Sequence, residues 1–352
     1  QPFHVMALLA RARELEAAGR SVIHMEIGEP DFVTPQPIID AGIRALQDGH
    51  THYTPATGLR ALREKIAGFY QSRYGVSIEP ERIVVTPGAS AALQLVLAAL
   101  VNSGDRVLLS DPGYPCNRNF VHLLDGEPVA IPVDAASGYQ PLPQQVSDHW
   151  TGQTRVLLVA SPSNPTGTLL DEQTLRDYHA ITGQRDGSLI VDEIYHGLTY
   201  DGAAATALAV ADDIFVINSF SKYFGMTGWR LGWLVAPREV VPAIDKLAQN
   251  LFLAAPTLAQ YAALRAFDDD VLAILDERRD QFRARRDYLL PALQDIGFDI
   301  AVKPAGAFYL YANCSRFTDD SDTFANRLLE EAGVAITPGI DFGANRSEHH
   351  VR

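Results

Sequence analysis

The chain has 352 residues, of which 47% are apolar and 20% are charged, and its net charge is −14. Single cores stop growing near roughly 250 to 300 residues, so this length favours two domains, and no apolar run is long enough to span a membrane. The acidic charge disfavours a nucleic-acid partner. The two cysteines, Cys116 and Cys314, show no metal-site spacing. They are also too few for a disulfide framework, which favours the reducing cytoplasm as the protein's location.

A helical pattern over 5–18 begins the chain. It carries charged residues such as Arg11 and Glu14 where a signal peptide would be apolar, so we expect no secretory leader in this segment. The sequence starts at Gln1 without an initiator methionine and stops at Arg352. We therefore expect both ends of the natural protein to lie outside it.

Short apolar runs alternate with helical patterns from residue 83 onward, which indicates a sheet with crossover helices. The run 89–101 predicts a buried helix, because polar residues end it before it reaches membrane-spanning length. The predicted fold class is α/β, with a large domain whose mostly parallel seven-stranded sheet is flanked by helices. The seven predicted strands cover 83–85, 107–109, 129–131, 156–159, 189–191, 215–217 and 233–235.

The segment 270–296 has apolar residues among many charges, which predicts a long amphipathic helix that is interrupted or ends near Pro291. Beyond it we expect a smaller α+β domain, against which the N-terminal residues pack. Its predicted elements are the apolar runs 298–300, 307–311 and 334–336 and a helix over 322–332. The predicted domains are a large cofactor-binding domain at 37–269 and a small domain built from both termini, 1–36 and 270–352.

Lys222 follows an apolar strand and a pair of serines and precedes several glycines and Arg230. A single lysine is usually a solvated surface residue, but this context predicts an amine held at a strand's carboxyl end beside an anion site. A Schiff-base enzyme needs such an amine, and pyridoxal 5′-phosphate also needs an acidic partner that keeps its ring nitrogen protonated. Asp192 follows the predicted strand 189–191 and is the candidate partner, although such a carboxylate often only caps the next helix.

Three other side chains follow predicted strands and could reach the same crevice. Tyr195 could donate a hydrogen bond to a ring oxygen. Asn164, in a loop with two prolines, could hold both a ring oxygen and a substrate carboxylate. Tyr114 could lie flat on an aromatic ring, which stabilises by about 0.5 to 1.5 kcal/mol beyond burial. A core tyrosine or an ordinary turn would explain each of them singly.

A phosphate site is predicted where the segment 86–93 connects a strand to a helix. Its small residues let backbone N–H groups approach an anion, and the helix N-terminus adds a partial positive charge. Taken alone, this segment is a common turn with Ser90 in the N-cap. Arg230 supplies a fixed cation whose planar fork suits two phosphate oxygens, and Ser219 and Ser221 offer hydroxyl groups nearby.

These segments together resemble the fold-type I, class I/II aminotransferases that use pyridoxal phosphate. The resemblance covers nearly the whole chain, and nine fragments in the family's order are hard to obtain by chance. The nine fragments are 28–32, 53–60, 86–93, 111–115, 164–167, 192–195, 219–232, 304–308 and 338–343.

The resemblance implies a role for each matching residue of the cofactor site. Lys222 would be the aldimine lysine and then the general base and acid that moves the proton between Cα and the cofactor. Asp192 would pair with the pyridinium, Tyr195 and Asn164 would hydrogen-bond the 3′ oxygen, and Tyr114 would stack on the ring. The catalytic residues would be Lys222, Asp192 and Tyr195. The phosphate would be held by Ala89, Ser90, Ser219 and Arg230.

The resemblance also implies a homodimer, because the family's equivalent of Tyr53 reaches the phosphate of the other subunit. Arg352 matches the family's arginine for the substrate α-carboxylate, with Asn164, and Gly28 would contribute a backbone N–H on the opposite side. Family members continue into another strand and helix after this arginine, whereas the sequence stops. We therefore expect Arg352 to be poorly placed.

The reaction implied is transfer of the amino group of an L-amino acid to a 2-oxo acid, through aldimine and ketimine forms of the cofactor. A β-lyase acting on cysteine conjugates is the alternative, and a cyclopropane-forming synthase shares the scaffold, because fold does not settle reaction. The run 226–230 favours transamination. The acidic charge disfavours a cofactor-binding transcriptional regulator, and no G-x-G-x-x-G follows a strand as in a dinucleotide-binding dehydrogenase.

The amino donor stays open at this point. Arg118 is a candidate cation for a second substrate carboxylate, as dicarboxylate-specific relatives would need. The neutral residues at 251–255 and Phe308 favour an apolar or aromatic side chain instead.

Overall fold

The computed structural model describes residues 4–202 and 204–352, and its centre is a seven-stranded sheet. The strand order is β2-β8-β7-β6-β5-β3-β4, in which only β8 runs antiparallel to its neighbours. The predicted α/β fold with a mostly parallel sheet is therefore confirmed. The strands are β2 (Ile83–Thr86), β3 (Arg106–Asp111), β4 (Glu127–Pro132), β5 (Thr154–Ala160), β6 (Ser188–Asp192), β7 (Phe215–Ser219) and β8 (Gly232–Val235).

Helices cover both faces of the sheet, because its central strands are apolar on both sides. In β5, Leu157 and Val159 join one core and Val156 and Leu158 join the other, as the two-residue period of a strand requires. The first core takes helical side chains from α2 (Gln36–Gln47), α3 (Arg60–Tyr74), α6 (Pro143–His149), α7 (Glu172–Gly183), α9 (Thr257–Ala263) and the start of the helix at Asp269–Ile296. The second takes them from α4 (Ala89–Leu100), α5 (Pro115–Leu123) and α8 (Val241–Leu251).

The carboxyl ends of five strands meet at one edge of the sheet. β2, β3, β5, β6 and β7 all point the same way, because β8 is antiparallel to both β2 and β7. The residues at or directly after these strand ends include Ala89, Tyr114, Asn164, Asp192 and Lys222. Ligands of open α/β sheets bind at this edge.

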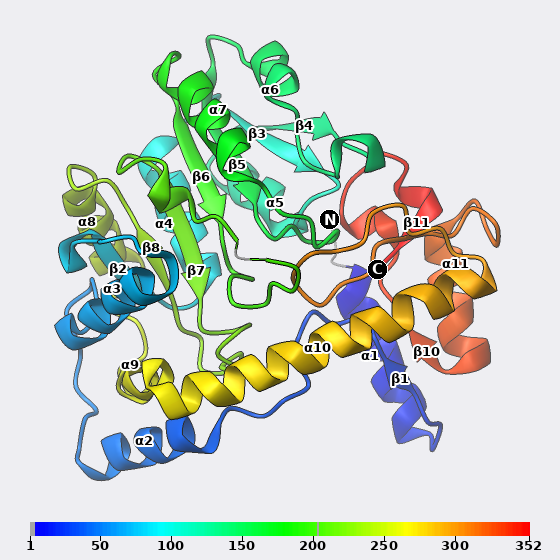
Figure 1. Ribbon diagram of the computed structural model, residues 1–352, viewed down its shortest axis with the longest axis horizontal. Helices are drawn as coiled ribbons and strands as arrows, with labels where there is room; N and C mark the ends of the chain where they lie inside the picture. Colours follow the sequence, from blue (N-terminus) through cyan, green and yellow to red (C-terminus); the bar gives the residue numbers. More distant parts are fainter. Residues whose placement is uncertain (1–3, 203) are drawn as a thin grey trace.

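The long helix α10 (Asp269–Ile296) connects the large sheet to a smaller lobe (Figure 1). The prediction of an interruption or end near Pro291 was wrong. Pro291 is exposed within the helix and removes only one backbone donor, so the neighbouring turns continue. The helix ends instead at Gly297, whose φ of 114° allows its N–H to bond the carbonyl of Leu293.

The smaller lobe is built from both ends of the chain. Strand β1 (Ile23–His24) pairs in parallel with β10 (Val334–Ala335), and β9 (Ala312–Asn313) pairs with β11 (His350–Val351). The remaining helices are α1 (His4–Ala17) and α11 (Ser321–Arg327), which continues as a π-helical turn over Leu328–Ala332. The core of this lobe contains Leu8, Ala12, Leu15, Ile300, Ala325, Leu329, Ala335 and Val351.

Two of the runs expected in this lobe are not strands. Residues 298–300 form only an isolated bridge between Asp299 and Asn313, and 307–311 follow another bridge, between Thr199 and Gly306. These runs are apolar because their side chains fill the lobe's core and the cavity wall, which needs no sheet partner. The N-terminal residues pack on this lobe as expected, whereas the domain boundaries at residues 37 and 270 stay a prediction.

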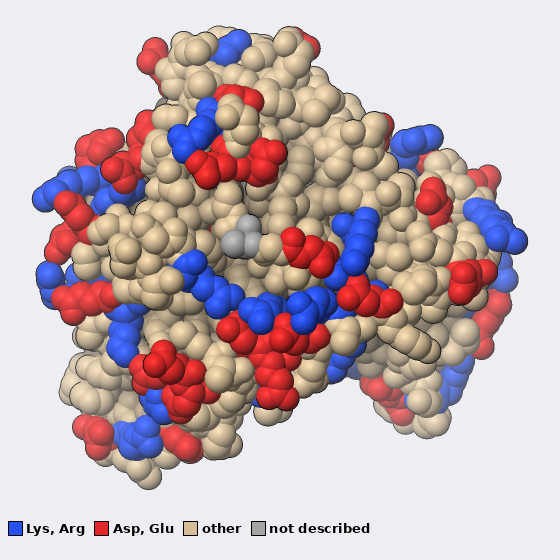
Figure 2. Space-filling view, viewed as in Figure 1, with Lys and Arg blue, Asp and Glu red and all other residues tan. Residues whose placement is uncertain are grey.

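The outer face of α10 carries charges of both signs (Figure 2). Arg285 pairs with Asp31 at 2.8 Å and lies over the ring of Phe32, so the helix holds the segment that leads into the cavity. Among the helices in the described part of the chain, none combines the length and apolar character that crossing a membrane requires.

Candidate active site

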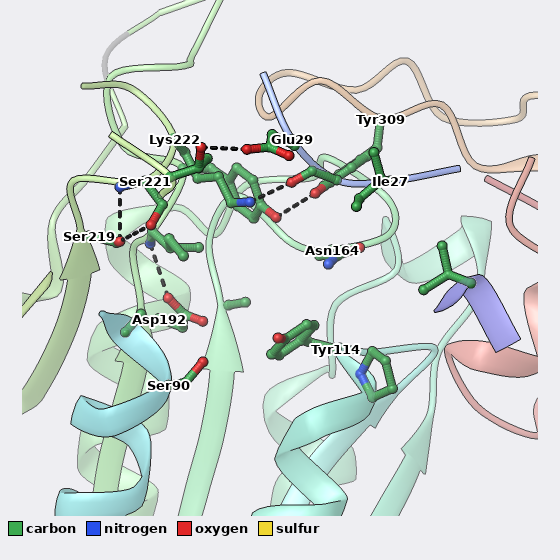
Figure 3. Close-up of a pocket in the computed structure, with 18 of the residues that line it drawn as sticks. Ile27, Glu29, Ser90, Tyr114, Asn164, Asp192, Ser219, Ser221, Lys222 and Tyr309 are labelled. Carbon is green, nitrogen blue, oxygen red and sulfur yellow. Dashed lines mark hydrogen bonds between the residues drawn. The ribbon is translucent and has the colours of Figure 1, made fainter. Parts of the chain in front are cut away.

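A cavity of about 390 Å³ lies at the carboxyl edge of the sheet, between the sheet and the smaller lobe (Figure 3). It brings together side chains from segments that are far apart in the sequence. Of the residues predicted for the site, every one except Tyr53 lines this cavity. They are Gly28, Ala89, Ser90, Tyr114, Asn164, Asp192, Tyr195, Ser219, Lys222, Arg230 and Arg352.

Lys222 reaches the cavity from the turn that follows β7, while the neighbouring Phe220 is fully buried in the core. Its Nζ donates a hydrogen bond to the carbonyl of Gly28 at 2.5 Å. Burial lowers the pKa of Lys222 to about 8, with the positive charges of Arg352 and Arg230 as weaker causes. The unprotonated share of this amine near neutral pH is therefore much larger than in an ordinary lysine, as a nucleophile or a base requires.

Asp192 is the last residue of β6 and its side chain is buried. Its Oδ1 accepts a hydrogen bond from the N–H of Ile194 at 3.0 Å, the only one that its carboxylate makes with the described residues. Burial raises the pKa of Asp192 to about 7. A cation brought into the cavity would stabilise the charged form of this buried carboxylate, and a protonated pyridine nitrogen is such a cation.

The turn between β2 and α4 is shaped to receive an anion. Gly88 has a φ of 83°, and a Cβ there would lie 2.7 Å from Nη2 of Arg230. The guanidinium therefore lies directly against the turn at the N-terminus of α4, where free backbone N–H groups carry partial positive charge. The N-cap is Gly88 rather than Ser90, as the helix begins at Ala89.

Two serines complete this side of the cavity. The hydroxyl of Ser219 accepts a hydrogen bond from the N–H of Ser221 at 3.0 Å and lies 3.0 Å from the Ser221 hydroxyl. Figure 3 shows Ser219, Ser221 and Ser90 on the same side of the cavity as Asp192. Hydroxyl, N–H and guanidinium donors that converge on one place are the donor set for a phosphate.

Arg352 enters the cavity from the smaller lobe. Its Nη1 donates to Oδ1 of Asn164 at 3.0 Å and its Nη2 donates to the carbonyl of Glu26 at 2.8 Å. The expectation that Arg352 is poorly placed was wrong, because its backbone exchanges two hydrogen bonds with Thr337, at 2.9 and 3.1 Å. Its guanidinium also lies 4.3 Å from the ring centroid of Tyr309.

Tyr309 is a cavity residue that sequence reasoning missed. Its hydroxyl lies 2.7 Å from that of Tyr195, and burial raises the pKa of both phenols. A Cβ on Gly28 would collide with the Tyr309 hydroxyl, so a glycine is needed at residue 28 for the close approach. The fragment 304–308 ends one residue before Tyr309 and was the available signal.

Tyr114 faces the cavity at the start of α5, and Figure 3 shows it across from Asp192. Burial raises its pKa, so the phenol stays neutral. Other missed residues lie within or beside the predicted fragments, such as Glu29 in the fragment 28–32, whose carboxylate accepts a hydrogen bond from the Thr227 hydroxyl at 2.5 Å. The remaining missed lining residues include Ile27, Thr337, Asp341 and Phe342.

Some candidate residues lie elsewhere. Tyr53 is 82% exposed and does not line the cavity of its own chain, so its predicted role at a partner's site stays a prediction. Arg118 donates to the carbonyl of Asp341 at 2.9 Å from outside the cavity. Leu251 and Leu253 are exposed and do not line the cavity of a single chain, whereas the ring centroid of Phe308 lies 5.8 Å from Nζ of Lys222, so the apolar donor pocket at these residues stays a prediction.

Comparison with known proteins gives matches over the whole chain. A family model described as "Aminotransferase class I and II" matches residues 20–352. A (5-formylfuran-3-yl)methyl phosphate transaminase of Methanocaldococcus jannaschii and a valine–pyruvate aminotransferase of Mycobacterium tuberculosis are each 39% identical, over 100% of this chain and 91% of theirs. The crystal structure of an aminotransferase from Mycobacterium tuberculosis matches with a TM-score of 0.96 at 39% identity, covering 100% of this chain and 91% of that one.

Proposed function

This chain belongs to the class I and II aminotransferase family and is an aminotransferase, and on that premise we propose how its cavity carries the reaction. The cavity binds pyridoxal 5′-phosphate, and the protein moves the amino group of an L-amino acid to a 2-oxo acid. One observation carries this proposal. The amine of Lys222 and the carboxyl of Asp192, both with pKa values shifted by burial, face one cavity, and the turn at Gly88 in the same cavity is shaped to receive an anion.

The residues present fit this cofactor. Arg230, the turn at Gly88 and Ala89, Ser90 and Ser219 would hold the phosphate. Asp192 would hold the protonated ring nitrogen, and that pairing would lower its raised pKa again. Tyr114 would pack on the ring, and Tyr195 and Asn164 would hydrogen-bond its oxygen. When bound, the protonated ring supplies an acceptor for the electron pair that the substrate's Cα leaves behind.

Lys222 carries both roles that need an amine. Its unprotonated Nζ would be the nucleophile that holds the cofactor, and once freed by the substrate amine it would be the base that accepts the proton from the substrate Cα. Desolvation keeps the amine neutral enough for this work near neutral pH. The buried wall of the cavity excludes bulk water from the proton that is being moved.

Arg352 and Asn164 bind the substrate's α-carboxylate. The guanidinium is held by the Glu26 carbonyl and by Asn164, and the ring of Tyr309 supports it, so its planar fork is oriented before substrate arrives. The N–H of Gly28 would serve the opposite side of the carboxylate. Fixing the carboxylate sets the direction of the Cα–H bond relative to Lys222.

The working unit that we infer is a homodimer in the cytoplasm, in which Tyr53 reaches the phosphate of the partner's site. Tyr53 is exposed and absent from its own cavity, and Leu251 and Leu253 are exposed apolar side chains on a nearby segment. Exposed apolar side chains that cluster mark association surfaces. Two unpaired cysteines, Cys116 and Cys314, fit a reducing compartment.

A β-lyase on the same scaffold remains the alternative reaction, but the relatives and the matching structure are aminotransferases and favour transamination. Their printed substrates differ from one another, so they support the reaction rather than one donor. Mixing the protein with amino donors separates the two reactions. A transaminase releases the donor's own 2-oxo acid without free ammonia and passes the amino group to an acceptor oxo acid, whereas a β-lyase breaks the Cβ–S bond and releases a thiol, ammonia and pyruvate.

Replacing Lys222 tests the proposal directly. We expect Lys222→Ala to lose the visible absorbance of the lysine-bound cofactor and nearly all turnover, because no other lysine of the described chain lines the cavity. Lys246→Ala, on the exposed face of α8, is the matched control and should retain both. Retention of the absorbance and turnover by Lys222→Ala would contradict the assignment.

A further inference from the structure

We propose that the preferred amino donor has an uncharged, apolar side chain, held by a wall that includes Val5, Ile27, Pro115 and Phe342. This inference rests on the proposed function, and it adds the class of side chain to it. The four residues line the same cavity as Lys222 and Arg352, and they come from α1, the segment after β1, the start of α5 and the segment before β11.

Each cationic side chain that lines the cavity already has a role in the proposed reaction. Within the part of the chain that the structure describes, the cavity is lined by the cationic side chains of Lys222, Arg230 and Arg352. These serve the amine chemistry, the phosphate and the α-carboxylate. Arg118, the candidate for a second carboxylate, lines a hollow beside the cavity, and its Nη2 is engaged by the carbonyl of Asp341 at 2.9 Å. A dicarboxylate substrate would therefore bring a second negative charge to a wall at which the described part of this chain presents no further cationic side chain.

Two acidic side chains make that place still less favourable to an anion. Glu29 and Asp341 both line the cavity. Asp341 accepts hydrogen bonds from the N–H groups of His4 and Val5, at 2.9 and 2.8 Å, and Glu29 accepts one from Thr227. The oxygens of Asp341 are thus used by the protein itself, which also makes this carboxylate a poor partner for a cationic substrate side chain.

The apolar wall is fixed in place by polar contacts behind it. The hydrogen bonds that the Asp341 carboxylate accepts hold the first turn of α1, and Val5 is buried against the cavity. Ile27 directly precedes Gly28, and Phe342 lies 4.8 Å beneath the guanidinium of Arg352. Figure 3 shows Ile27 beside Tyr309 on the side of the cavity away from Asp192. A side chain extending from a carboxylate bound at Arg352 meets these apolar surfaces, whose burial favours apolar groups.

The experiment follows the cofactor's absorbance in the holoenzyme after mixing with single donors. Valine, leucine and phenylalanine are compared with aspartate, glutamate and lysine. We expect the apolar donors to react with second-order rate constants about tenfold or more above those of the charged donors. Equal or faster reaction of aspartate, glutamate or lysine would overturn the inference.

A binding measurement gives a second readout that does not depend on turnover. Fluorescence titration of the holoenzyme with two unreactive acids, 4-methylpentanoate and maleate, compares an apolar tail with a second carboxylate. We expect 4-methylpentanoate to bind about tenfold tighter, and tighter binding of maleate would overturn the inference. A protein that reacted with no amino donor would contradict the proposed function instead, and the two acids would still decide the class of side chain.

Ile27→Lys tests the wall itself, because it adds the missing cation beside Gly28. We expect the ratio of aspartate to leucine reactivity to rise about tenfold or more in this variant. Ile23→Lys is the control: Ile23 is exposed on β1 and does not line the cavity, so the ratio should stay as in the unmodified protein. An unchanged ratio in folded, cofactor-loaded Ile27→Lys would contradict the placement of the donor's side chain at this wall.

Discussion

At the scale of single residues, two ionisable groups of the cavity have pKa values that lie closer together than in water. Burial lowers the pKa of Lys222 to about 8 and raises that of Asp192 to about 7. The cause is shared, because a buried site disfavours the charged form of a base and of an acid alike. The shifted pKa values therefore suit the two groups to different tasks. Lys222 supplies a neutral amine more readily than an ordinary lysine does, and Asp192 supplies a site for a cation.

The lowered pKa of Lys222 predicts how the cofactor-free protein captures pyridoxal phosphate. Capture requires the neutral amine, so its rate should rise as the pH passes about 8 and level off above that value. Arg352→Gln should move this midpoint upward, since the charge of Arg352 is one of the causes that lower the pKa. Stopped-flow absorbance measures the rate. A midpoint near 10.5, the ordinary value for lysine, would refute the role of burial.

At the scale of elements, the turn between β2 and α4 decides whether an anion can approach. Gly88 has a φ of 83° and a ψ of 169°, a region open to glycine alone, and its missing Cβ leaves the space that Arg230 occupies. Two requirements thus meet in one residue: the backbone conformation and the close approach of a guanidinium. Local strand and helix propensities fix neither of them.

Gly88→Ala and Gly104→Ala separate these two requirements. Both glycines have positive φ, 83° and 82°, so both substitutions should destabilise the fold by about 1 to 3 kcal/mol. A Cβ at residue 104 meets nothing within 4 Å, whereas one at residue 88 meets Arg230. We therefore expect only Gly88→Ala to weaken the binding of pyridoxal phosphate, and of inorganic phosphate as its competitor, in equilibrium titrations. Equal affinity in the two variants would remove Arg230 and this turn from the phosphate site.

At the scale of the whole molecule, one buried amide joins the two loops that bear the exposed apolar side chains. The side chain of Gln260 is fully buried, accepts from the N–H of Leu59 at 2.8 Å, and donates to the Thr54 hydroxyl and the Ala255 carbonyl at 2.9 and 3.0 Å. Thr54 follows Tyr53, and Ala255 lies two residues after Leu253. The hydrogen bonds of Gln260 thus fix both loops on their buried side, while the apolar side chains at their tips stay exposed. A surface of this kind can bind a second copy of the chain.

Mixing two defective variants tests the shared sites of the proposed dimer. Tyr53→Glu should place a carboxylate beside the partner's phosphate and weaken cofactor binding, while Lys222→Ala removes the amine of its own site. Refolded together, the variants form hybrid dimers in which one site carries both lesions and the other carries neither. We expect activity to return in the mixture, and Tyr53→Phe alone to be only mildly impaired.

Two results would contradict this arrangement. Sedimentation of the unmodified protein as a monomer would exclude a shared site, because Tyr53 does not line its own cavity. A mixture as inactive as its parents, with hybrid dimers present by mass spectrometry of differently tagged subunits, would place Tyr53 outside the partner's site.

The sequence by itself determined the seven strands, the buried helix that follows residue 88 and most of the residues at the cavity. Buried strands such as Val156–Leu158 are apolar on both faces, and Lys222, Asp192 and Asn164 follow such strands directly, so local patterns were sufficient. The local pattern gave wrong predictions at Pro291 and at the runs 298–300 and 307–311. A proline on an exposed helix face removes only one backbone hydrogen bond, so the helix continues through it. Short apolar runs can fill a core without pairing as strands.

Only the tertiary structure decided which distant segments meet. Arg352 is oriented by Asn164, Glu26 and Tyr309, residues that no local pattern joins to it, and the sheet pairs strands that are far apart in sequence, such as β2 and β8. The same holds for the apolar wall, where Asp341 fixes Val5 from 336 residues away. Propensity and periodicity act over a few residues, whereas burial, close approach and charge compensation depend on which surfaces face each other in the folded chain.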